Sequence, residues 1–364
     1  MILVVADDLS GAAELAGIAL AHGLTAEVQT EFHARTEAQV ICLDTNTRRL
    51  APTEAATLMQ RLSRRLLAAR PELIFKKTDS ALRGNIGAEL TVLLEATART
   101  GAIFVPANPS RGRVIRGGNY FIGDSPLHET DFANDPRHPA TTADVAERLG
   151  HDPAIAIPEA ASQTDVLAAA RSVDDLVLPA GAGDFFAALL ETRGHPAIPT
   201  KITPASGQAL FVCGSMAAWG RGRAGHCEAR GVPVRNMPPE LFGQSEHPAA
   251  LYAWAETACS ALAEHGACML AIGRMKAVDH APRLESRLVQ AMAMVLAQME
   301  VDRLLLEGGA TASAALARLK WKHLRAVDLA APDLPSLRVD DDAPRMFMKP
   351  GSYNWPDSVW PTDG

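Results

Sequence analysis

The sequence predicts an α/β protein of two domains, each with a mainly parallel sheet flanked by helices. Short apolar runs alternate with longer helical patterns along the chain, which is the order of elements typical of this class. The runs are continuously apolar, as in strands that are buried on both faces. The chain has 364 residues, and because domains usually hold roughly 100–200 residues, two are expected.

The first half contains four such runs. Strands are expected at 2–5, 40–43, 73–75 and 102–107, with helices at 11–23, 53–69 and 87–100. Residues 108–140 interrupt this alternation with many Gly, Pro, Asn, Asp and Arg residues, and a loop of that length is usually functional or disordered. Its apolar and aromatic side chains, among them Tyr120, Phe121 and Phe132, favour an ordered insertion that carries a hairpin.

A linker is expected around residues 195–208, where three prolines fall in a stretch without periodicity. A second series of elements follows it. Its strands are expected at 209–215, 232–237, 268–273, 303–309 and 324–329, and its helices at 249–265, 281–300 and 310–320. The predicted domains are therefore 1–205 and 206–364.

Composition excludes several classes of protein. The net charge of −7 and the pI of about 5.9 argue against a nucleic-acid partner. No apolar run reaches the ~18 residues of a membrane span, and the start "MILVVADD" resembles no targeting segment. The five cysteines form no C-x-x-C pair, which suits reduced thiols and gives no zinc signal. A cytoplasmic protein is expected, and a homo-oligomer is left open.

Polar side chains follow two of the buried strands in the first domain. Asp7 and Asp8 leave the first strand, and Lys77, Asp79 and Arg83 follow the strand at 73–75. Ligands of open parallel sheets bind outside the carboxyl ends of the strands. An arginine there suits a carboxylate or phosphate, and a carboxylate suits a substrate hydroxyl or acts as a base. Two structural alternatives are a carboxylate that caps the following helix and a surface ion-pair cluster.

Glycine turns mark the second domain. Gly214 and Ser215 lie between a strand and a helix, Gly308 and Gly309 lie at a second junction of this kind, and a further turn, "KPGSYNW", spans 349–355. Glycine lets a ligand approach the backbone, and the N–H groups that follow can cradle an anion such as phosphate. Two such junctions in one domain suggest a nucleotide site. The structural alternative is a pair of tight strand-to-helix turns.

Several familiar signatures do not occur: the P-loop, H-E-x-x-H and G-x-S-x-G. A G-x-G-x-x-G pattern does occur at Gly220, Gly222 and Gly225. It lies seven or more residues past the end of the preceding strand, too far for a dinucleotide fingerprint. It gives weak support to a nicotinamide site, and the sequence leaves any metal ligands unknown.

Five motifs lie in order from residue 6 to residue 353: "ADDLSGAAE", "KKTDSALRGNIGAEL", "GRVIRGGNYFIGDSPLHETDFANDPRHP", "EGGATA" and "KPGSY". Together they resemble the motifs of the four-carbon acid sugar kinases. Members of this family use ATP to phosphorylate four-carbon acids such as threonate, erythronate or 3-oxo-tetronates. The resemblance implies that the N-terminal domain binds the sugar acid and the C-terminal domain binds ATP, with Mg²⁺ on the phosphates.

The matching positions give two sets of site residues. The set expected to face the sugar acid is Asp7, Asp8, Lys77, Asp79, Ser80 and Arg83, with Asp8, Asp79 and Arg83 as the catalytic candidates. The set expected to line the ATP site is Ser215, Gly308, Gly309, Ala310, Thr311, Lys349, Gly351 and Ser352.

The sequence departs from the family pattern at Cys213, Ala310 and Asn354, all in the half that is expected to bind ATP. Two alternatives to a kinase are therefore kept. One is a non-catalytic acid-sugar binder whose ATP site has decayed, and the other is a nicotinamide-dependent oxidoreductase that uses the glycines at 220–225. The sequence specifies neither the acid nor the hydroxyl that is phosphorylated.

Overall fold

The structure is a computed structural model of the whole chain. It describes residues 1–135, 137–199, 202, 206–215, 222–273, 281–332, 334–349 and 354–361. The chain divides into two compact units, Met1–Pro199 and Thr200–Gly364, and each is treated by itself below.

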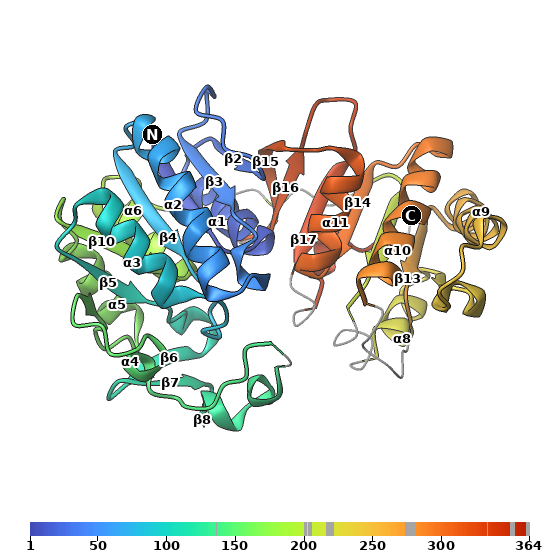
Figure 1. Cartoon of the computed structure of the whole chain (residues 1–364). Coiled ribbons are helices and arrows are strands. Elements are labelled where there is room, and N and C mark those ends of the chain that lie inside the picture. Colours follow the sequence, from blue (N-terminus) through green and yellow to red (C-terminus); the bar gives the residue numbers. More distant parts are fainter. Residues whose placement is uncertain are drawn as a thin grey trace. The chain divides into compact units, whose positions relative to one another are not determined.

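The first unit is built on a parallel sheet whose strands lie in the order β2–β3–β1–β4–β10–β5–β9 (Figure 1). The strands are β1 (Ile2–Ala6), β2 (Ala26–Gln29), β3 (Val40–Asp44), β4 (Leu73–Lys77), β5 (Gly101–Val105), β9 (Ile155–Ala156) and β10 (Val177–Gly181). Every residue of β1, β3 and β4 is buried. Continuous apolar runs in these strands therefore reflect burial of both faces, as the sequence predicts.

Helices cover this sheet on both faces. The helices are α1 (Leu9–Ala21), α2 (Pro52–Ala68), α3 (Ile86–Thr97), α4 (Val145–Arg148), α5 (Gln163–Arg171) and α6 (Gly183–Thr192). The connection through α1 leads from β1 outward to β2, whereas α2 leads from β3 back across β1 to β4. Because crossovers between parallel strands are right-handed, these two connections cover opposite faces. The chain thus changes direction along the sheet at β1, which places a switch point beside this strand.

The insertion after β5 is ordered, as expected from its aromatic residues. It forms a small antiparallel sheet of β6 (Arg113–Arg116), β7 (Asn119–Ile122) and β8 (Ser125–Pro126). Short 3-10 turns η2 (Pro109–Arg111), η3 (Leu127–Glu129) and η4 (Asp131–Asn134) flank it. Tyr120 anchors the hairpin, since its ring is buried and its hydroxyl donates to the carbonyl oxygens of Ser80 and Pro106.

The second unit has a mainly parallel sheet in the order β12–β13–β11–β14–β17–β16–β15. Its strands are β11 (Ala209–Cys213), β12 (Val234–Asn236), β13 (Ala267–Ala271), β14 (Arg303–Glu307), β15 (His323–Ala331), β16 (Leu334–Arg338) and β17 (Arg345–Lys349). The neighbouring strands β12, β13, β11, β14 and β17 pair in parallel. β16 pairs antiparallel with both β15 and β17. The sequence predicts a strand at 324–329, but not its antiparallel neighbours β16 and β17.

Helices α8 (Arg223–Glu228), α9 (Pro248–His265), α10 (Ala281–Gln298) and α11 (Gly309–Leu319) belong to the second unit, with the 3-10 turns η5 (Pro239–Phe242) and η6 (Asp357–Val359). The core beside β11 is aromatic. The ring of Phe211 stacks on Trp360 with centroids 5.0 Å apart and meets Trp355 edge-on. The tail that carries both tryptophans is therefore part of this core.

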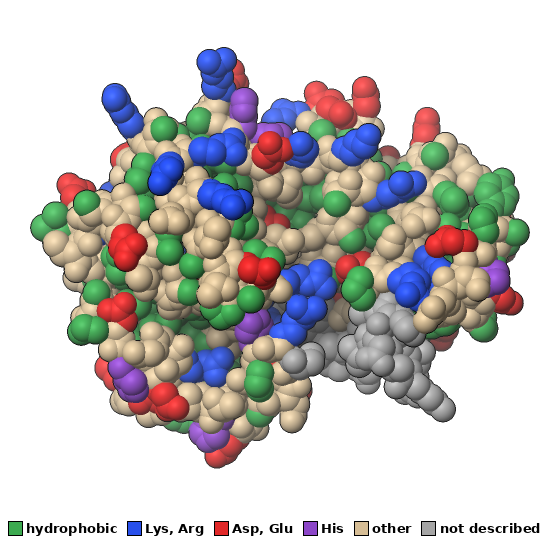
Figure 2. All heavy atoms as spheres, viewed as in Figure 1, with side chains coloured by type: hydrophobic (Ala, Val, Ile, Leu, Met, Phe, Trp, Pro, Cys, Tyr) green, Lys and Arg blue, Asp and Glu red, His purple; other side chains and the backbone are tan. Residues whose placement is uncertain are grey.

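The described residues contain no helix that is both long and apolar enough to cross a membrane. On the face drawn in Figure 2, hydrophobic side chains are scattered among charged and polar ones.

Candidate active site

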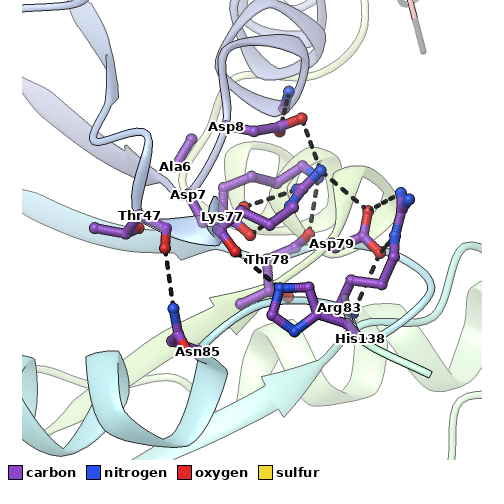
Figure 3. A network of polar contacts seen from close by, with 12 residues as sticks. Ala6, Asp7, Asp8, Thr47, Lys77, Thr78, Asp79, Arg83, Asn85 and His138 are labelled. Carbon is purple, nitrogen blue, oxygen red and sulfur yellow. Dashed lines mark hydrogen bonds and ion pairs between the residues drawn. The ribbon is translucent and has the colours of Figure 1, made fainter. Parts of the chain in front are cut away.

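Three adjacent strands of the first unit end at one place in the sheet. In the register, Ala6 at the end of β1 lies opposite Asp44 of β3 and Lys77 of β4. The chain beyond each strand then contributes side chains to one polar network (Figure 3). Asp7 and Asp8 follow β1, the 3-10 turn η1 (Thr47–Arg49) follows β3, and Asp79 follows β4. This is the edge of a parallel sheet where ligands bind.

The centre of the network is Arg48, which the sequence analysis did not single out. Its guanidinium donates to both oxygens of Asp7, from Nε at 2.8 Å and from NH2 at 2.9 Å. Its NH1 donates to Oδ2 of Asp8 at 2.7 Å and lies 3.5 Å from Oδ1 of Asp79. One guanidinium therefore meets three carboxylates, two of them buried.

The turn that carries Arg48 is fixed by its backbone. The side-chain amide of Asn85 donates to the carbonyl oxygens of Thr47 at 2.9 Å and Leu50 at 3.0 Å. The N–H of Arg48 donates to the carbonyl oxygen of Asp7 at 3.2 Å. Asn85 belongs to the motif "LRGNIG", so one role of this motif is to hold the neighbouring turn in place.

Burial and charge act in opposite directions on these groups. Burial disfavours the ionised form of Asp7, but the pair with Arg48 outweighs it and lowers the pKa of Asp7 below its ordinary 3.8. Burial alone would lower the pKa of Arg48, yet Asp7, Asp8 and Asp79 raise it well above the ordinary value. The charged forms of these partners therefore stabilise one another.

Asp8 has two contacts of different kinds. Its Oδ1 accepts a hydrogen bond from the N–H of Gly11 at 2.9 Å, which caps the N-terminus of α1. Its Oδ2 accepts from Arg48 and from the hydroxyl of Ser10. The structural alternative in which one carboxylate caps this helix therefore holds for Asp8, and the same side chain also belongs to the polar network.

Asp79 and Arg83 are paired. The guanidinium of Arg83 donates to Asp79 from Nε at 2.8 Å and from NH2 at 2.9 Å, while its NH1 lies 3.5 Å from Oδ2 of Asp135. Asp79 is only 7% exposed, so its side chain is buried and does not face solvent at the strand end. Burial opposes ionisation of Asp79, but Arg83 and Arg48 hold its pKa well below the usual range. The ion pair between Asp79 and Arg83 is of the kind that the structural alternative, an ion-pair cluster, predicts.

The two lysines at the end of β4 point to different partners. The ammonium of Lys77 donates to the carbonyl oxygen of Thr78 at 2.9 Å and lies 3.1 Å from Oε2 of Glu14 on α1. The ammonium of Lys76 lies 2.7 Å from Oε2 of Glu89 on α3, with both side chains 1% exposed. Lys77 is therefore buried beneath the site, and Lys76 ties the strand to a helix.

The insertion contributes a further wall. The ring of Phe132 lies 5.3 Å from the guanidinium carbon of Arg83 and 5.9 Å from that of Arg113. Arg113 also donates to the hydroxyl of Ser80, and the Nε2 of His138 donates to the carbonyl oxygen of Arg48 at 2.8 Å. Ser80, predicted to face substrate, is thus held by Arg113. The third motif of the resemblance contains all three insertion residues, which is the signal that points to them.

Asp44, at the end of β3, differs from its neighbours. It is buried, and its Oδ1 accepts a hydrogen bond from the N–H of Asn46 at 2.7 Å. Burial, together with the nearby carboxylates of Asp8 and Asp7, raises its pKa to about 7. This carboxyl group therefore takes up a proton at a much higher pH than an ordinary aspartate.

Strand ends of the second unit also meet in one row. Cys213 at the end of β11 lies opposite Glu307 of β14, which lies opposite Lys349 of β17. Both predicted glycine turns begin here. A Cβ on Gly214 would lie 2.3 Å from the Oγ1 of Thr311, so only glycine fits against α11. Gly308 has a φ of +103°, a conformation that favours glycine.

The predicted ATP-site residues are partly assembled by this row. Ser215 follows Gly214, Gly308 is the N-cap of α11, and Gly309, Ala310 and Thr311 form the first turn of that helix. Lys349 ends β17. Gly351 and Ser352 lie outside the described residues, as does Gly220 of the G-x-G-x-x-G pattern. Gly222 is the N-cap of the short helix α8, and Gly225 lies within this helix. Neither position is the strand-to-helix turn of a dinucleotide site.

Among the residues that the structure describes, no group of three or more His, Cys, Asp or Glu side chains is placed to hold a metal ion. The five cysteines are buried free thiols, and none of them forms a disulfide.

Comparison with known proteins identifies the family. Residues 2–185, about half of the chain, match the family model described as "Sugar-binding N-terminal domain". The chain belongs to this family.

Curated relatives carry kinase names. A D-threonate kinase of Bordetella bronchiseptica is 29% identical over 91% of this chain and 88% of its own length. A D-erythronate kinase of Heliobacterium modesticaldum is 34% identical over 40% of this chain and 35% of its own length. A 3-oxo-tetronate kinase of Methylobacterium radiotolerans is 32% identical over 66% of this chain and 60% of its own length. The resemblance stated from the sequence is confirmed, and so is the prediction of a kinase.

Solved structures share the fold. A Salmonella typhimurium protein superimposes with a TM-score of 0.80 at 17% identity, covering 98% of this chain and 97% of that one. This confirms the predicted α/β class. A domain of unknown function from Bordetella bronchiseptica, a domain-swapped dimer with bound citrate, matches with a TM-score of 0.50 at 26% identity, covering 98% of this chain and 96% of that one.

Proposed function

We propose that the protein is an ATP-dependent kinase that phosphorylates a hydroxyl group of a four-carbon sugar acid of the threonate, erythronate or 3-oxo-tetronate type. The observation that carries this proposal is the similarity to a D-threonate kinase along nearly the full length of both chains. The cytoplasm is the compartment we propose for it.

The sugar acid is proposed to bind in the first unit, at the end of β1 and β4. Arg83 supplies the anion contact. Two of its nitrogens are held by Asp79, but its NH1 is 3.5 Å from Asp135, which leaves that contact longer than a charged hydrogen bond. The substrate carboxylate would displace Asp135 there. Asp8 and Asp79 are proposed to accept hydrogen bonds from substrate hydroxyls, and Asp7 and Lys77 support them from the buried side.

ATP is proposed to bind in the second unit, over the two glycine turns. Phosphate groups suit the free N–H groups at the start of α11 and the ammonium of Lys349. Mg²⁺ on the phosphates neutralises charge as the phosphoryl group is transferred. Magnesium in such sites is usually held by phosphates and one or two carboxylates rather than by a protein cage, which agrees with the small number of carboxylates described here.

The direct test is turnover. Purified protein with ATP and Mg²⁺ is expected to release ADP in a coupled assay with at least one of the threonates, erythronates or 3-oxo-tetronates, because the related kinases carry these names. A five-carbon acid of the same class serves as the control. If folded protein turns over none of the four-carbon acids, the kinase proposal fails.

A second test concerns the glycine turn. Gly309→Val is expected to raise the KM for ATP by about tenfold or more, since a displaced phosphate loses charge-assisted hydrogen bonds worth about 1.5–3 kcal/mol. Affinity for the sugar acid should stay near that of the wild type. The matched control is Ala317→Val, which puts the same side chain at an exposed position later in α11. Unchanged ATP kinetics in folded Gly309→Val protein would mean that the nucleotide binds at another place.

A further inference from the structure

A buried cluster of three charged side chains lies beside the glycine turns of the second unit. The carboxylate of Glu307 receives the ammonium of Lys349 at 2.6 Å and the guanidinium of Arg223 at 2.9 and 3.1 Å, all on its Oε1 atom. The side chains of Glu307, Arg223 and Lys349 are 1%, 3% and 6% exposed. Within the described part of the chain, the second oxygen of Glu307 has no hydrogen-bond partner.

Among the described residues, the cluster brings two cations to one carboxylate. One carboxylate faces two cations, and the nearby thiol of Cys213 stays neutral because burial raises its pKa to about 12. The ammonium of Lys349 lies over the face of the Trp355 ring, 4.8 Å from the ring centroid. Two cations held this close together at a strand end favour the binding of an anion beside them.

The cluster adjoins the proposed phosphate turn. The N–H of Gly308 donates to the carbonyl oxygen of Lys349 at 2.9 Å, which ties the turn to the lysine. Glu307 immediately precedes Gly308 in the chain. The helix α11 begins at Gly309, so its unpaired N–H groups lie at the same place. The described cations and the helix N-terminus thus favour the same kind of ligand.

We propose that Arg223 and Lys349 bind the phosphate groups of the nucleotide, and that Glu307 is a positioning residue that orients both cations. This inference rests on the proposed nucleotide site and adds Arg223 and Glu307 to it. Neither residue was predicted from the sequence as part of that site. Arg223 lies in α8, some 80 residues from Glu307 in the chain, although Glu307 itself stands in the motif "EGGATA".

The cluster gives the site a pH dependence. Burial lowers the pKa of Lys349 to about 8, against the opposing effect of Glu307, and the neighbouring Arg223 lowers it further. A bound phosphate favours the charged ammonium and raises that pKa, so binding takes up a proton above pH 8. Affinity for ATP is therefore expected to fall as the pH rises through about 8.

The experiment measures ATP–Mg²⁺ binding by titration calorimetry for the full chain. Arg223→Met should weaken ATP binding by about 10- to 100-fold, the range for lost charged hydrogen bonds. It leaves Glu307 and Lys349 as a neutral pair, so the variant should fold. The control Arg318→Met removes an exposed arginine near the other end of α11 and should bind ATP like the wild type.

Glu307→Gln tests the positioning role. It removes the charge that favours protonated Lys349, so the pH at which ATP affinity falls should shift from about 8 to a lower value. A purely structural role for Glu307 would leave that pH unchanged.

The outcomes separate the two proposals. If wild-type protein binds no ATP, the nucleotide site itself is wrong, and this inference falls with it. If wild-type protein binds ATP and folded Arg223→Met protein binds it with the same affinity as the wild type and the Arg318→Met control, the nucleotide proposal survives and this inference is overturned. An unshifted pH profile in folded Glu307→Gln protein overturns the role of Glu307.

Discussion

Arg48→Met is expected to lower the free energy of unfolding by about 3–5 kcal/mol, the cost of breaking a buried ion pair by removal of one partner. The variant leaves Asp7 buried without the two hydrogen bonds that now satisfy its carboxylate, and it removes the cation from Asp8 and Asp79. Chemical denaturation followed by circular dichroism measures the loss. The control is Arg49→Met, because this neighbouring arginine is exposed and its substitution should change stability by less than about 0.5 kcal/mol.

The same comparison made across pH gives a second readout. The pKa values of Asp7 and Asp79 are lowered in the folded protein, so their contribution to stability is present above the ordinary value of 3.8 and is lost as the pH falls through the folded values. The difference between wild type and Arg48→Met should therefore be largest near neutral pH and should narrow below about pH 4. A difference that stays constant with pH would mean that packing, and not charge, makes Arg48 important.

Arg83→Lys and Asp79→Asn are expected to affect different steps of the proposed reaction. Arg83→Lys keeps the charge but loses the NH1 group that is proposed to contact the substrate carboxylate, so binding of the sugar acid should weaken by about 1–3 kcal/mol. Asp79→Asn keeps the shape but removes the charge that orients a hydroxyl, and it should lower kcat more than it raises KM. Steady-state kinetics for both substrates measure the two effects.

The pairing of Asp79 with Arg83 makes a stability measurement necessary beside the kinetics. Arg83→Lys weakens the pair by removing its two-nitrogen geometry, and Asp79→Asn removes its negative charge, so each variant is expected to melt at a lower temperature than the wild type. If the two side chains serve only as a structural ion pair, the folded fraction will turn over substrate like the wild type. That result would remove Asp79 and Arg83 from the catalytic set. Arg171→Lys, at the exposed end of α5, is the control for the arginine change.

Some strands were predictable and others were not, for reasons that can be seen in their side chains. β1 and β4 contain continuous apolar runs and were expected. β2 was missed because Glu27 and Gln29 make it look polar, although both are buried: the amide of Gln29 donates to Glu27 at 3.0 Å. β10 was missed because Pro179 interrupts its apolar run. Residue type alone does not distinguish a buried polar side chain that has hydrogen-bond partners from an exposed one.

The same limit applies to the site. The sequence places Asp8 and Asp79 after strands, and the structure brings both to Arg48. Arg48 and Arg49 stand side by side in "TNTRRL", and only the geometry of the η1 turn decides which one is buried among carboxylates. Asp135 is distant in sequence and reaches Arg83 through the insertion. Motifs can therefore indicate strand ends, but the partner of each charge depends on tertiary contacts.

The sharing of one guanidinium by Asp7, Asp8 and Asp79 joins these three carboxylates in one electrostatic network. A proton that binds to Asp7 or to Asp79 leaves more of the field of Arg48 for the other, so the titrations of these two carboxylates are coupled. Substitutions within this trio are consequently not additive: the cost of losing two members differs from the sum of the single costs by a coupling energy, of about 0.5–3 kcal/mol for residues in one network. The effect of any substitution at this end of the sheet therefore depends on the trio and its arginine as a unit.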